Sequence, residues 1–266
     1  MMAFAGNSLL CRLALKSTTI DAASFTTIRL ISGTLALWLL VRLKRGMHPS
    51  KGSWVSAVAL FAYAAGFSYA YMSLPAATGA LLLFGAVQAT MISCGLYRGE
   101  RFHWRQIVGL MLAFGGLVGL LLPGLSAPPL YGSLQMLAAG VAWGIYSLRG
   151  IGAKDPITET AGNFLRAAPV AVGLSVLMMS QTSFDHAGML YAILSGAVTS
   201  GIGYAIWYAA LPALSGVSAA TVQLSVPVLA AVGGIVLLGE SITLRLGLAS
   251  AAILSGIALV ILQKQR

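Results

Sequence analysis

Long apolar runs separated by short polar segments dominate the chain. A helix needs about 20 mostly apolar residues to cross the hydrocarbon core of a bilayer. The connections between the runs are about 4 to 12 residues long and leave no room for a soluble domain. The runs are solidly apolar and lack the alternating ~10-residue segments of a membrane barrel, so they favour helices. The pattern predicts an all-α membrane protein with ten transmembrane helices, at 2–15, 22–41, 54–72, 76–97, 104–122, 130–148, 159–179, 189–208, 217–238 and 244–262.

The first of these runs is unusually short. About 14 residues rise roughly 21 Å as a helix, less than the ~30 Å hydrocarbon core. Neither a basic start nor a small-residue cleavage site indicates a signal peptide. We therefore expect the sequence to begin inside its natural first helix, so that this helix is truncated. A short helix packed among the others is the alternative.

Composition excludes several classes of protein. Of 266 residues, 58% are hydrophobic and only 8% are charged, against about 25% charged in an ordinary soluble domain. This excludes a typical cytosolic enzyme, a nucleic-acid-binding module and a disordered regulator. The two cysteines, Cys11 and Cys94, lie in apolar runs without the spacing of a zinc or haem site. No metal or other cofactor is predicted.

The net charge of +10 is explained by the placement of the basic residues. If the amino terminus is cytoplasmic, eleven of the 16 Lys and Arg residues lie in cytoplasmic connections or in the carboxyl-terminal tail. Only Lys16 and Arg245 lie in outer connections. The positive-inside rule then predicts cytoplasmic termini, and the location we expect is a bacterial inner membrane. The charge does not indicate a nucleic-acid partner.

The two halves of the chain resemble each other. Gly99-Glu100 and Gly239-Glu240 are 140 positions apart, and Arg29 and Arg166 pair at a slightly smaller offset. We predict two five-helix repeats, 1–126 and 127–266. Because five is odd, the second repeat must be inverted, and equivalent connections indeed differ in basic charge. Inverted repeats are typical of secondary transporters, whose substrate site lies near mid-membrane between the repeats.

These features resemble the EamA family of the drug/metabolite transporter superfamily over nearly the whole chain. The resemblance rests on Ala5-Gly6-Asn7, Arg29, Gly99-Glu100, Trp143-Gly144, Arg166 and Gly239-Glu240-Ser241. It implies export or exchange of small metabolites, often amino acids or their relatives, by alternating access. It also implies that central helices form the cavity and that the fifth and tenth helices are more peripheral.

Polar and aromatic residues inside the apolar runs are candidates for the substrate cavity. An amide facing lipid would leave its hydrogen bonds unmade. Helix–helix hydrogen bonding is the alternative for the amides. For Tyr and Trp residues near the ends of runs, the alternative is a position at the membrane–water interface. The candidates are Asn7, Tyr63, Gln88, Trp143, Tyr146, Asn163, Tyr204, Tyr208 and Gln223.

Four charged residues are candidates for gating or electrostatic roles. Arg29 and Arg166 each lie about seven residues into a run, where a cation costs about 2.5 to 3.5 kcal/mol at the membrane centre. Each either attracts an anionic group such as a substrate carboxylate or reaches the nearer interface and fixes helix depth. Glu100 and Glu240 either couple transport to protons or bond a local backbone N–H or a nearby arginine.

Three further features complete the prediction. Arg12 is expected to reach the membrane interface from the end of the first helix. Pro169 and Pro227 lie within runs and are candidates for helix breaks, with static kinks as the alternative. GxxxG pairs such as Gly115 and Gly119 are compatible with a homodimer and equally with close packing inside one bundle.

The function predicted from the sequence is transport of a small amphipathic metabolite, an amino acid or a related compound, by alternating access. The partners are this substrate and the lipid bilayer. A multidrug-type exporter and a channel-like facilitator are the alternatives. An enzyme is not predicted, because the sequence places no paired carboxylates, metal-ligand cluster or Ser/His pair at membrane depth.

Overall fold

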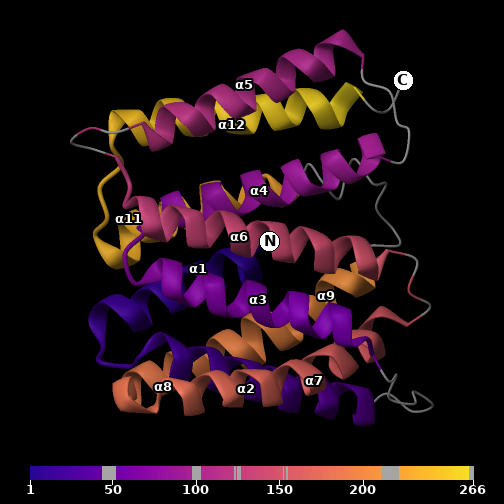
Figure 1. Ribbon diagram of the computed structural model, residues 1–266, viewed down its shortest axis with the longest axis vertical. Coiled ribbons are helices and arrows are strands. Elements are labelled where there is room, and N and C mark those ends of the chain that lie inside the picture. Colours follow the sequence, from indigo (N-terminus) through magenta and orange to yellow (C-terminus); the bar gives the residue numbers. More distant parts are fainter. Residues whose placement is uncertain are drawn as a thin grey trace.

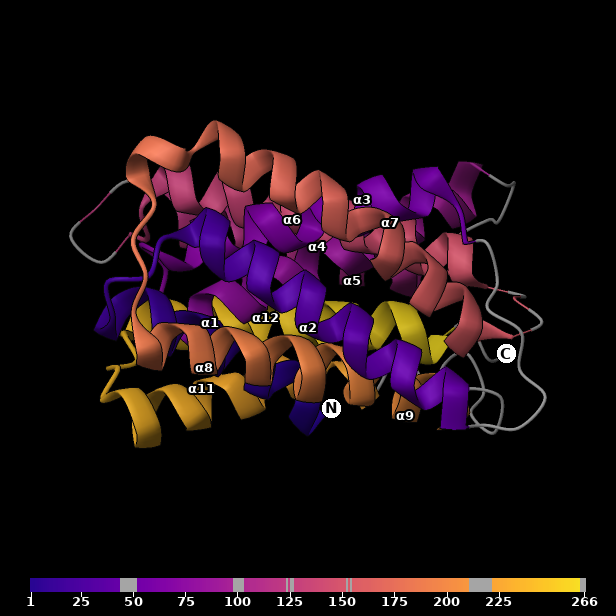
Figure 2. The same ribbon diagram turned by 90° about the horizontal axis from the view of Figure 1, so that it is seen from below.

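A computed structural model describes residues 1–43, 52–97, 103–122, 124, 127–151, 153, 155–210 and 222–263. All regular structure in these ranges is helical, and the helices lie side by side (Figure 1 and Figure 2). The helices of the first half are α1 (Met2–Ser17), α2 (Ala22–Leu43), α3 (Trp54–Tyr71), α4 (Ala76–Tyr97) and α5 (Trp104–Leu121). Those of the second half are α6 (Leu130–Gly150), α7 (Pro156–Leu177), η1 (Met179–Gln181), α8 (His186–Leu194), η2 (Ser195–Ile202), α9 (Gly203–Ala210), α11 (Ser225–Leu238) and α12 (Leu244–Gln263).

Seven helical segments of the described chain are long and apolar enough to cross a membrane. They are α2, α3, α4, α5, α7, α12 and the continuous run from α8 through η2 into α9. The chain is therefore an integral, multi-pass membrane protein. The remaining predicted runs correspond to α1, α6 and α11, so the number of ten spans stays a prediction.

Local sequence signals explain where several helices begin and end. The side chains of Asp155 and Asp185 accept hydrogen bonds from backbone N–H groups in the first turns of α7 and α8, at 3.3 and 2.7 Å. Pro156 begins α7, where a missing N–H costs nothing. Gly239 ends α11 with φ of 63°, a left-handed conformation that favours glycine.

The helix contacts repeat between the two halves. Three helices of the first half contact the helices at the same place in the second half: α2 contacts α7, α4 contacts α11, and α5 contacts α12. The contact of α3 with α6 corresponds to that of α1 with α8 and η2, and the contact of α2 with η2 corresponds to that of α3 with α7. The α5–α12 pair lies at one edge of the molecule (Figure 1). This pattern is expected when one five-helix unit is used twice, although the boundary near residue 126 stays a prediction.

The two ends of the bundle are distinguished by different polar contacts. At one end, which we call the Glu240 end, Arg12 near the end of α1 donates to the carbonyl oxygens of Tyr71 and Met72 at the end of α3. At the other end, the Asn163 end, Arg149 near the end of α6 donates to Ser53 and Ser56 at the start of α3, at 3.2 and 3.1 Å. The helices α1 and α6 therefore run in opposite directions, as inverted repeats require.

The two prolines lie at different places in their helices, and a turn at Leu224 separates the helical residues 222–223 from the helix that contains Pro227. Pro169 lies inside α7, which continues as one helix from Pro156 to Leu177. Pro227 is the third residue of α11, which begins at Ser225, and so it lies in the first turn and not near the middle of a helix. A first-turn proline removes an N–H that has no intrahelical partner, so it stabilises a helix start.

Asp21 links the α1–α2 connection to the segment before α8 through hydrogen bonds. Its carboxylate oxygens accept from the backbone N–H groups of Ser24 at 2.8 Å and Ser183 at 3.0 Å. Burial by itself would raise the pKa of Asp21, but these hydrogen bonds outweigh it and hold the pKa below the usual value. The ionised carboxylate is thus part of the folded state.

We expect Asp21→Asn to lower thermal stability at neutral pH, by about 1 kcal/mol for a lost hydrogen bond. An amide presents one acceptor where the carboxylate presents two. Because the pKa is lowered on folding, the wild-type advantage is complete above the unfolded pKa of about 3.9 and disappears as pH falls through the folded pKa. Thermal unfolding of both proteins in detergent between pH 3 and pH 7 checks this. An equal difference at all pH values would contradict the assignment.

Candidate functional site

A cluster of polar side chains lies buried where the two halves of the chain meet. Asn7 on α1 donates to the hydroxyl of Tyr63 on α3 at 3.1 Å, and its carbonyl oxygen accepts from Ser195 on η2 at 2.6 Å. Arg29 on α2 donates to the same Tyr63 oxygen at 3.1 Å and to Ser200 on η2 at 3.3 Å. We call Asn7, Arg29, Tyr63, Ser195 and Ser200 the central cluster. It joins three helices of the first half to one segment of the second.

Arg29 is the most unusual member of the central cluster. Arg29 is 1% exposed. Its guanidinium carbon lies 5.2 Å from the ring centroid of Tyr63 and 5.0 Å from that of Phe67. No carboxylate of the described residues lies within 4 Å of it, and its Nη1 has no hydrogen-bond partner among them. Aromatic faces offset part of the desolvation of a cation, but the positive charge has no nearby anion in this part of the chain.

The segment η2 that meets Arg29 is π-helical. Such stretches are rare, and they occur frequently at functional sites. The backbones approach closely here, because a Cβ added at Gly33 on α2 would lie 3.1 Å from the carbonyl oxygen of Gly196 on η2. A Cβ at Gly196 would overlap with the Arg29 carbonyl and the Ser32 hydroxyl. Small residues thus bring the hydroxyl groups of η2 within reach of Arg29 and Asn7.

An aromatic layer borders the central cluster. Trp143 on α6 packs against Tyr63 at 4.7 Å, Tyr204 on α9 at 5.1 Å and Tyr146 at 5.4 Å between ring centroids. Phe4 on α1 contacts both Trp143 and Tyr204. These rings surround the polar groups with an apolar, polarisable wall.

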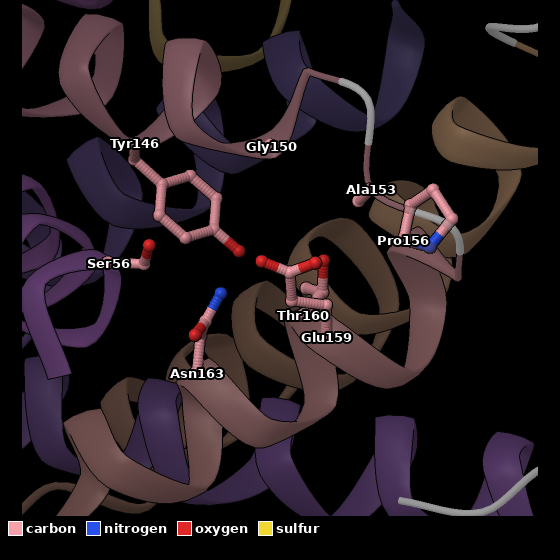
Figure 3. A pocket seen from close by; sticks show the side chains of 8 residues that line it. All are labelled: Ser56, Tyr146, Gly150, Ala153, Pro156, Glu159, Thr160 and Asn163. Atoms are coloured by element: carbon pink, nitrogen blue, oxygen red, sulfur yellow. The ribbon is translucent and has the colours of Figure 1, made fainter. Parts of the chain in front are cut away.

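A recess opens beside this layer at the Asn163 end (Figure 3). Tyr146 points into it, opposite the side chains of Asn163 and Glu159, and Ser56 lies on its α3 side. The enclosed space is about 10 Å³, which is what one water molecule requires. The recess is therefore closed to a metabolite in this conformation, and Tyr146 and Trp143 separate it from Tyr63. Its lining consists of Ser56, Tyr146, Gly150, Ala153, Pro156, Glu159, Thr160 and Asn163.

A buried ion pair closes the Glu240 end. Arg12 Nε lies 3.1 Å from Glu240 Oε1, and their side chains are 11% and 9% exposed. The second carboxylate oxygen of Glu240 accepts from the backbone N–H of Ala76 at 2.8 Å, at the start of α4. The expectation that Arg12 reaches the membrane interface is therefore wrong. Arg12 turns into the protein because Glu240 and the two free carbonyls at the end of α3 satisfy its donors.

The structure separates the two arginines that the sequence pairs. Arg166 on α7 is half-buried, donates to the carbonyl oxygen of Gly162 at 3.4 Å and lies 5.6 Å from the ring of Trp54. It is not part of the central cluster, and neither is Asn163, whose carbonyl oxygen accepts from the backbone N–H of Ser53 at 2.8 Å. Arg166 Nε, like Arg29 Nη1, is buried without a hydrogen-bond partner among the described residues, but Arg166 is half-buried whereas Arg29 is 1% exposed.

The other candidates lie elsewhere. Gln88 is buried in α4, and the hydrogen bonds of the central cluster do not include it. Gln223 is half-buried just before α11. Glu100 and the side chain of Tyr208 lie outside the described residues. Asn7, Arg29, Tyr63, Trp143, Tyr146 and Tyr204 are the candidates that the structure brings together.

Sequence reasoning missed the contribution of η2. Ser195 and Ser200 were passed over because single serines are common in membrane helices and bond their own backbone. The available signal was the run Ser195–Ile202, in which small and hydroxyl residues stand where a span is usually bulky and apolar. Phe4 and Phe67 were missed because an apolar ring in an apolar helix carries no distinguishing pattern.

Comparison with known proteins identifies the class to which this fold belongs. The model of the EamA-like transporter family matches residues 1–122 and 130–262, which is nearly the whole chain in two segments. The chain therefore belongs to the EamA family of transporters within the drug/metabolite transporter superfamily.

Individual relatives agree with this assignment. An uncharacterized protein of Pseudomonas aeruginosa is 57% identical over 98% of this chain and 91% of its own length. A protein of Streptantibioticus cattleyicolor named a probable terminal-alkyne amino-acid exporter is 26% identical over 69% of this chain and 63% of its own length. An uncharacterized transporter of Archaeoglobus fulgidus is 28% identical over 64% of this chain and 62% of its own length. A crystal structure with 21% identity superposes over 100% of this chain and 97% of its own with a TM-score of 0.69, which supports the fold.

Proposed function

We propose that this transporter moves small amphipathic metabolites, with amino acids and related compounds as the substrate class, by alternating access. The observation that carries the proposal is the central cluster, in which Asn7, Arg29 and Tyr63 of one matched segment meet Ser195 and Ser200 of the other. A site shared by two inverted repeats changes its accessible side when the repeats rock. The exporter name of the Streptantibioticus cattleyicolor relative supports an amino-acid-like substrate.

The ends of the bundle suit such a cycle. The Glu240 end is held by a buried ion pair with backbone hydrogen bonds, and the Asn163 end carries the small polar recess. A larger cavity of about 150 Å³ lies among α4, α11 and α12, but its lining is mainly apolar. We propose that the Asn163 end is cytoplasmic, because the even-numbered connections with most of the Lys and Arg residues belong there. The chain would then load from the cytoplasm and release outside, as an exporter of an inner membrane does.

The polar groups in the interior of the described chain support transport by a carrier and not catalysis or conduction through a channel. The central cluster is bordered by aromatic rings, and the other buried polar side chains, such as Thr26 with Ser68 and Gln106 with the Val260 carbonyl, bond in separate places, whereas a channel requires a continuous polar path. Among the described residues, Glu240 is the acidic residue with a buried, ion-paired side chain, and it lies at an end of the bundle. We propose transport without an intramembrane carboxylate relay, which also disfavours a multidrug exporter that attracts cations.

We expect purified protein in liposomes to exchange radiolabelled amino acids saturably, with counterflow when unlabelled substrate is enclosed. Tyr146→Ala is expected to reduce the exchange about tenfold or more, because it opens the wall between recess and cluster and removes the Trp143 stacking contact. Tyr131→Ala, at an exposed position at the start of α6, is the control and should leave exchange unchanged. Flux that is linear in concentration, without counterflow, would contradict the carrier mechanism.

A further inference from the structure

Arg29 is a buried cation whose donors are only partly used. Its Nε and Nη2 bond Ser200 and Tyr63, while its Nη1 is buried without a partner among the described residues. Each hydrogen left unbonded in an apolar surrounding costs free energy. The guanidinium therefore presents an unsatisfied donor group to the interior of the protein.

The neighbours of Arg29 add donors and leave the site short of acceptors. The oxygen of Tyr63 accepts from both Asn7 and Arg29. Its own proton is then available to an acceptor outside this pair. Positive charge and surplus donors in one place select an anion with several acceptor oxygens, because charge-assisted hydrogen bonds are the strong ones.

We infer that Arg29, with Tyr63, is the binding site for the carboxylate group of the transported substrate. This inference rests on the proposed function and assigns a chemical class to its substrate: organic acids and amino acids that carry a free carboxylate. The planar guanidinium matches a carboxylate in geometry and charge. Binding cancels the positive charge that this part of the protein otherwise leaves uncompensated.

The surroundings indicate what the rest of such a substrate resembles. Phe67, Trp143 and Tyr204 supply aromatic surface around the carboxylate position. An aliphatic or aromatic side chain packs against these rings, and an ammonium group is attracted to their faces. An apolar amino acid satisfies all of these features, whereas its amide or its decarboxylated amine lacks the group that Arg29 binds.

Matched ligands test the inference in liposomes that contain the whole protein. The probes are leucine, methionine and phenylalanine, each with its amide and its decarboxylated amine, and 4-methylpentanoate as a carboxylate without an ammonium. We expect transport of the carboxylates, with the amides and amines at least tenfold slower. Arg29→Gln should reduce carboxylate transport about 10- to 100-fold, as expected for the loss of hydrogen bonds to a charged group. Arg29→Lys keeps the charge and should retain part of it.

Two further variants separate recognition from structural support. Tyr63→Phe keeps the ring and removes the hydroxyl, so carboxylate transport should fall while the thermal midpoint of the empty protein changes little. Arg166→Gln alters the counterpart arginine, which bonds Gly162 in its own helix, and should leave transport unchanged. Thermal stabilisation by added leucine provides a binding readout that does not depend on transport. This stabilisation should be absent with leucinamide and in Arg29→Gln.

The outcomes distinguish this inference from the proposed function. If the wild type transports amides or amines as well as acids, the carboxylate site is refuted and the transporter stands. If Arg29→Gln folds and transports leucine at the wild-type rate, the site is likewise refuted. If the wild type moves none of the labelled compounds and none stabilises it, the proposed substrate class fails and the carboxylate site fails with it.

Discussion

Replacing Glu240 with glutamine is expected to open the end of the bundle that Glu240 closes. The carboxylate pairs with Arg12 at 3.1 Å and accepts from the N–H of Ala76 at 2.8 Å, and both side chains are about nine-tenths buried. Removing one partner of a buried ion pair leaves the other charge uncompensated, which costs about 3 to 5 kcal/mol. A large part of this cost can be relieved if the end opens and Arg12 reaches water.

The native cysteine beside Arg12 reports this opening. Cys11 is fully buried. In a Cys94→Ala background, Cys11 should resist a membrane-impermeant maleimide in the wild type and react at least tenfold faster with Glu240→Gln. Arg245→Gln is the control, because Arg245 lies at the same end, is half-buried and donates to the carbonyl oxygen of Leu122. Equal labelling of Cys11 in both proteins, at an unchanged thermal midpoint, would refute the role of the ion pair.

Exchanging the charges of Arg12 and Glu240 tests whether the charge pair alone closes this end. The double variant Arg12→Glu with Glu240→Arg restores opposite charges but is not expected to restore closure. Arg12 also donates to the carbonyl oxygens of Tyr71 and Met72, and Glu240 also accepts from a backbone N–H. In the exchanged pair a carboxylate faces carbonyls and a guanidinium faces an N–H. Recovery of wild-type protection in this variant would mean that the charge pair alone closes the end.

The sequence predicted most of the helix positions because length and hydropathy determine which segments can lie in a membrane. The predicted run 22–41 corresponds to α2 at Ala22–Leu43, and the run 76–97 corresponds to α4 at Ala76–Tyr97. Within the run 217–238, the described residues are not one continuous helix. A turn at Leu224 precedes α11, which begins at Ser225, because Pro227 suits a first turn and not the interior of a helix.

The site could be predicted only in part because hydropathy does not say which face of a helix points inward. Both α2 and α7 carry an arginine about seven residues from their start, and the repeat makes the two look equivalent. Only the packing places Arg29 against η2 while Arg166 lies near Trp54. The contact between Arg12 and Glu240 spans 228 positions. No local pattern could have revealed it.

Gly196→Ala is expected to separate the two halves of the central cluster. The added Cβ would overlap with the carbonyl oxygen of Arg29 and the hydroxyl of Ser32. A backbone carbonyl inside α2 cannot move aside alone, so α2 and η2 must shift apart. Overpacking of this kind costs about 1 to 3 kcal/mol, and an immovable neighbour favours the upper part of this range. The hydrogen bond between Arg29 and Ser200, already 3.3 Å long, would be lost.

Because a glycine-to-alanine change also alters helix propensity, a control glycine is needed, and α5 provides one. Gly115 is exposed, and a Cβ there would meet no atom of the described residues within 4 Å. Alanine at such a position favours the helix by up to about 1 kcal/mol, so Gly115→Ala should match or exceed the wild-type thermal midpoint. Gly196→Ala should lower both this midpoint and amino-acid exchange, with the loss of exchange at least tenfold at a temperature where the variant is folded. If Gly196→Ala instead behaves like Gly115→Ala in both measurements, the close approach of α2 and η2 does not organise the site around Arg29.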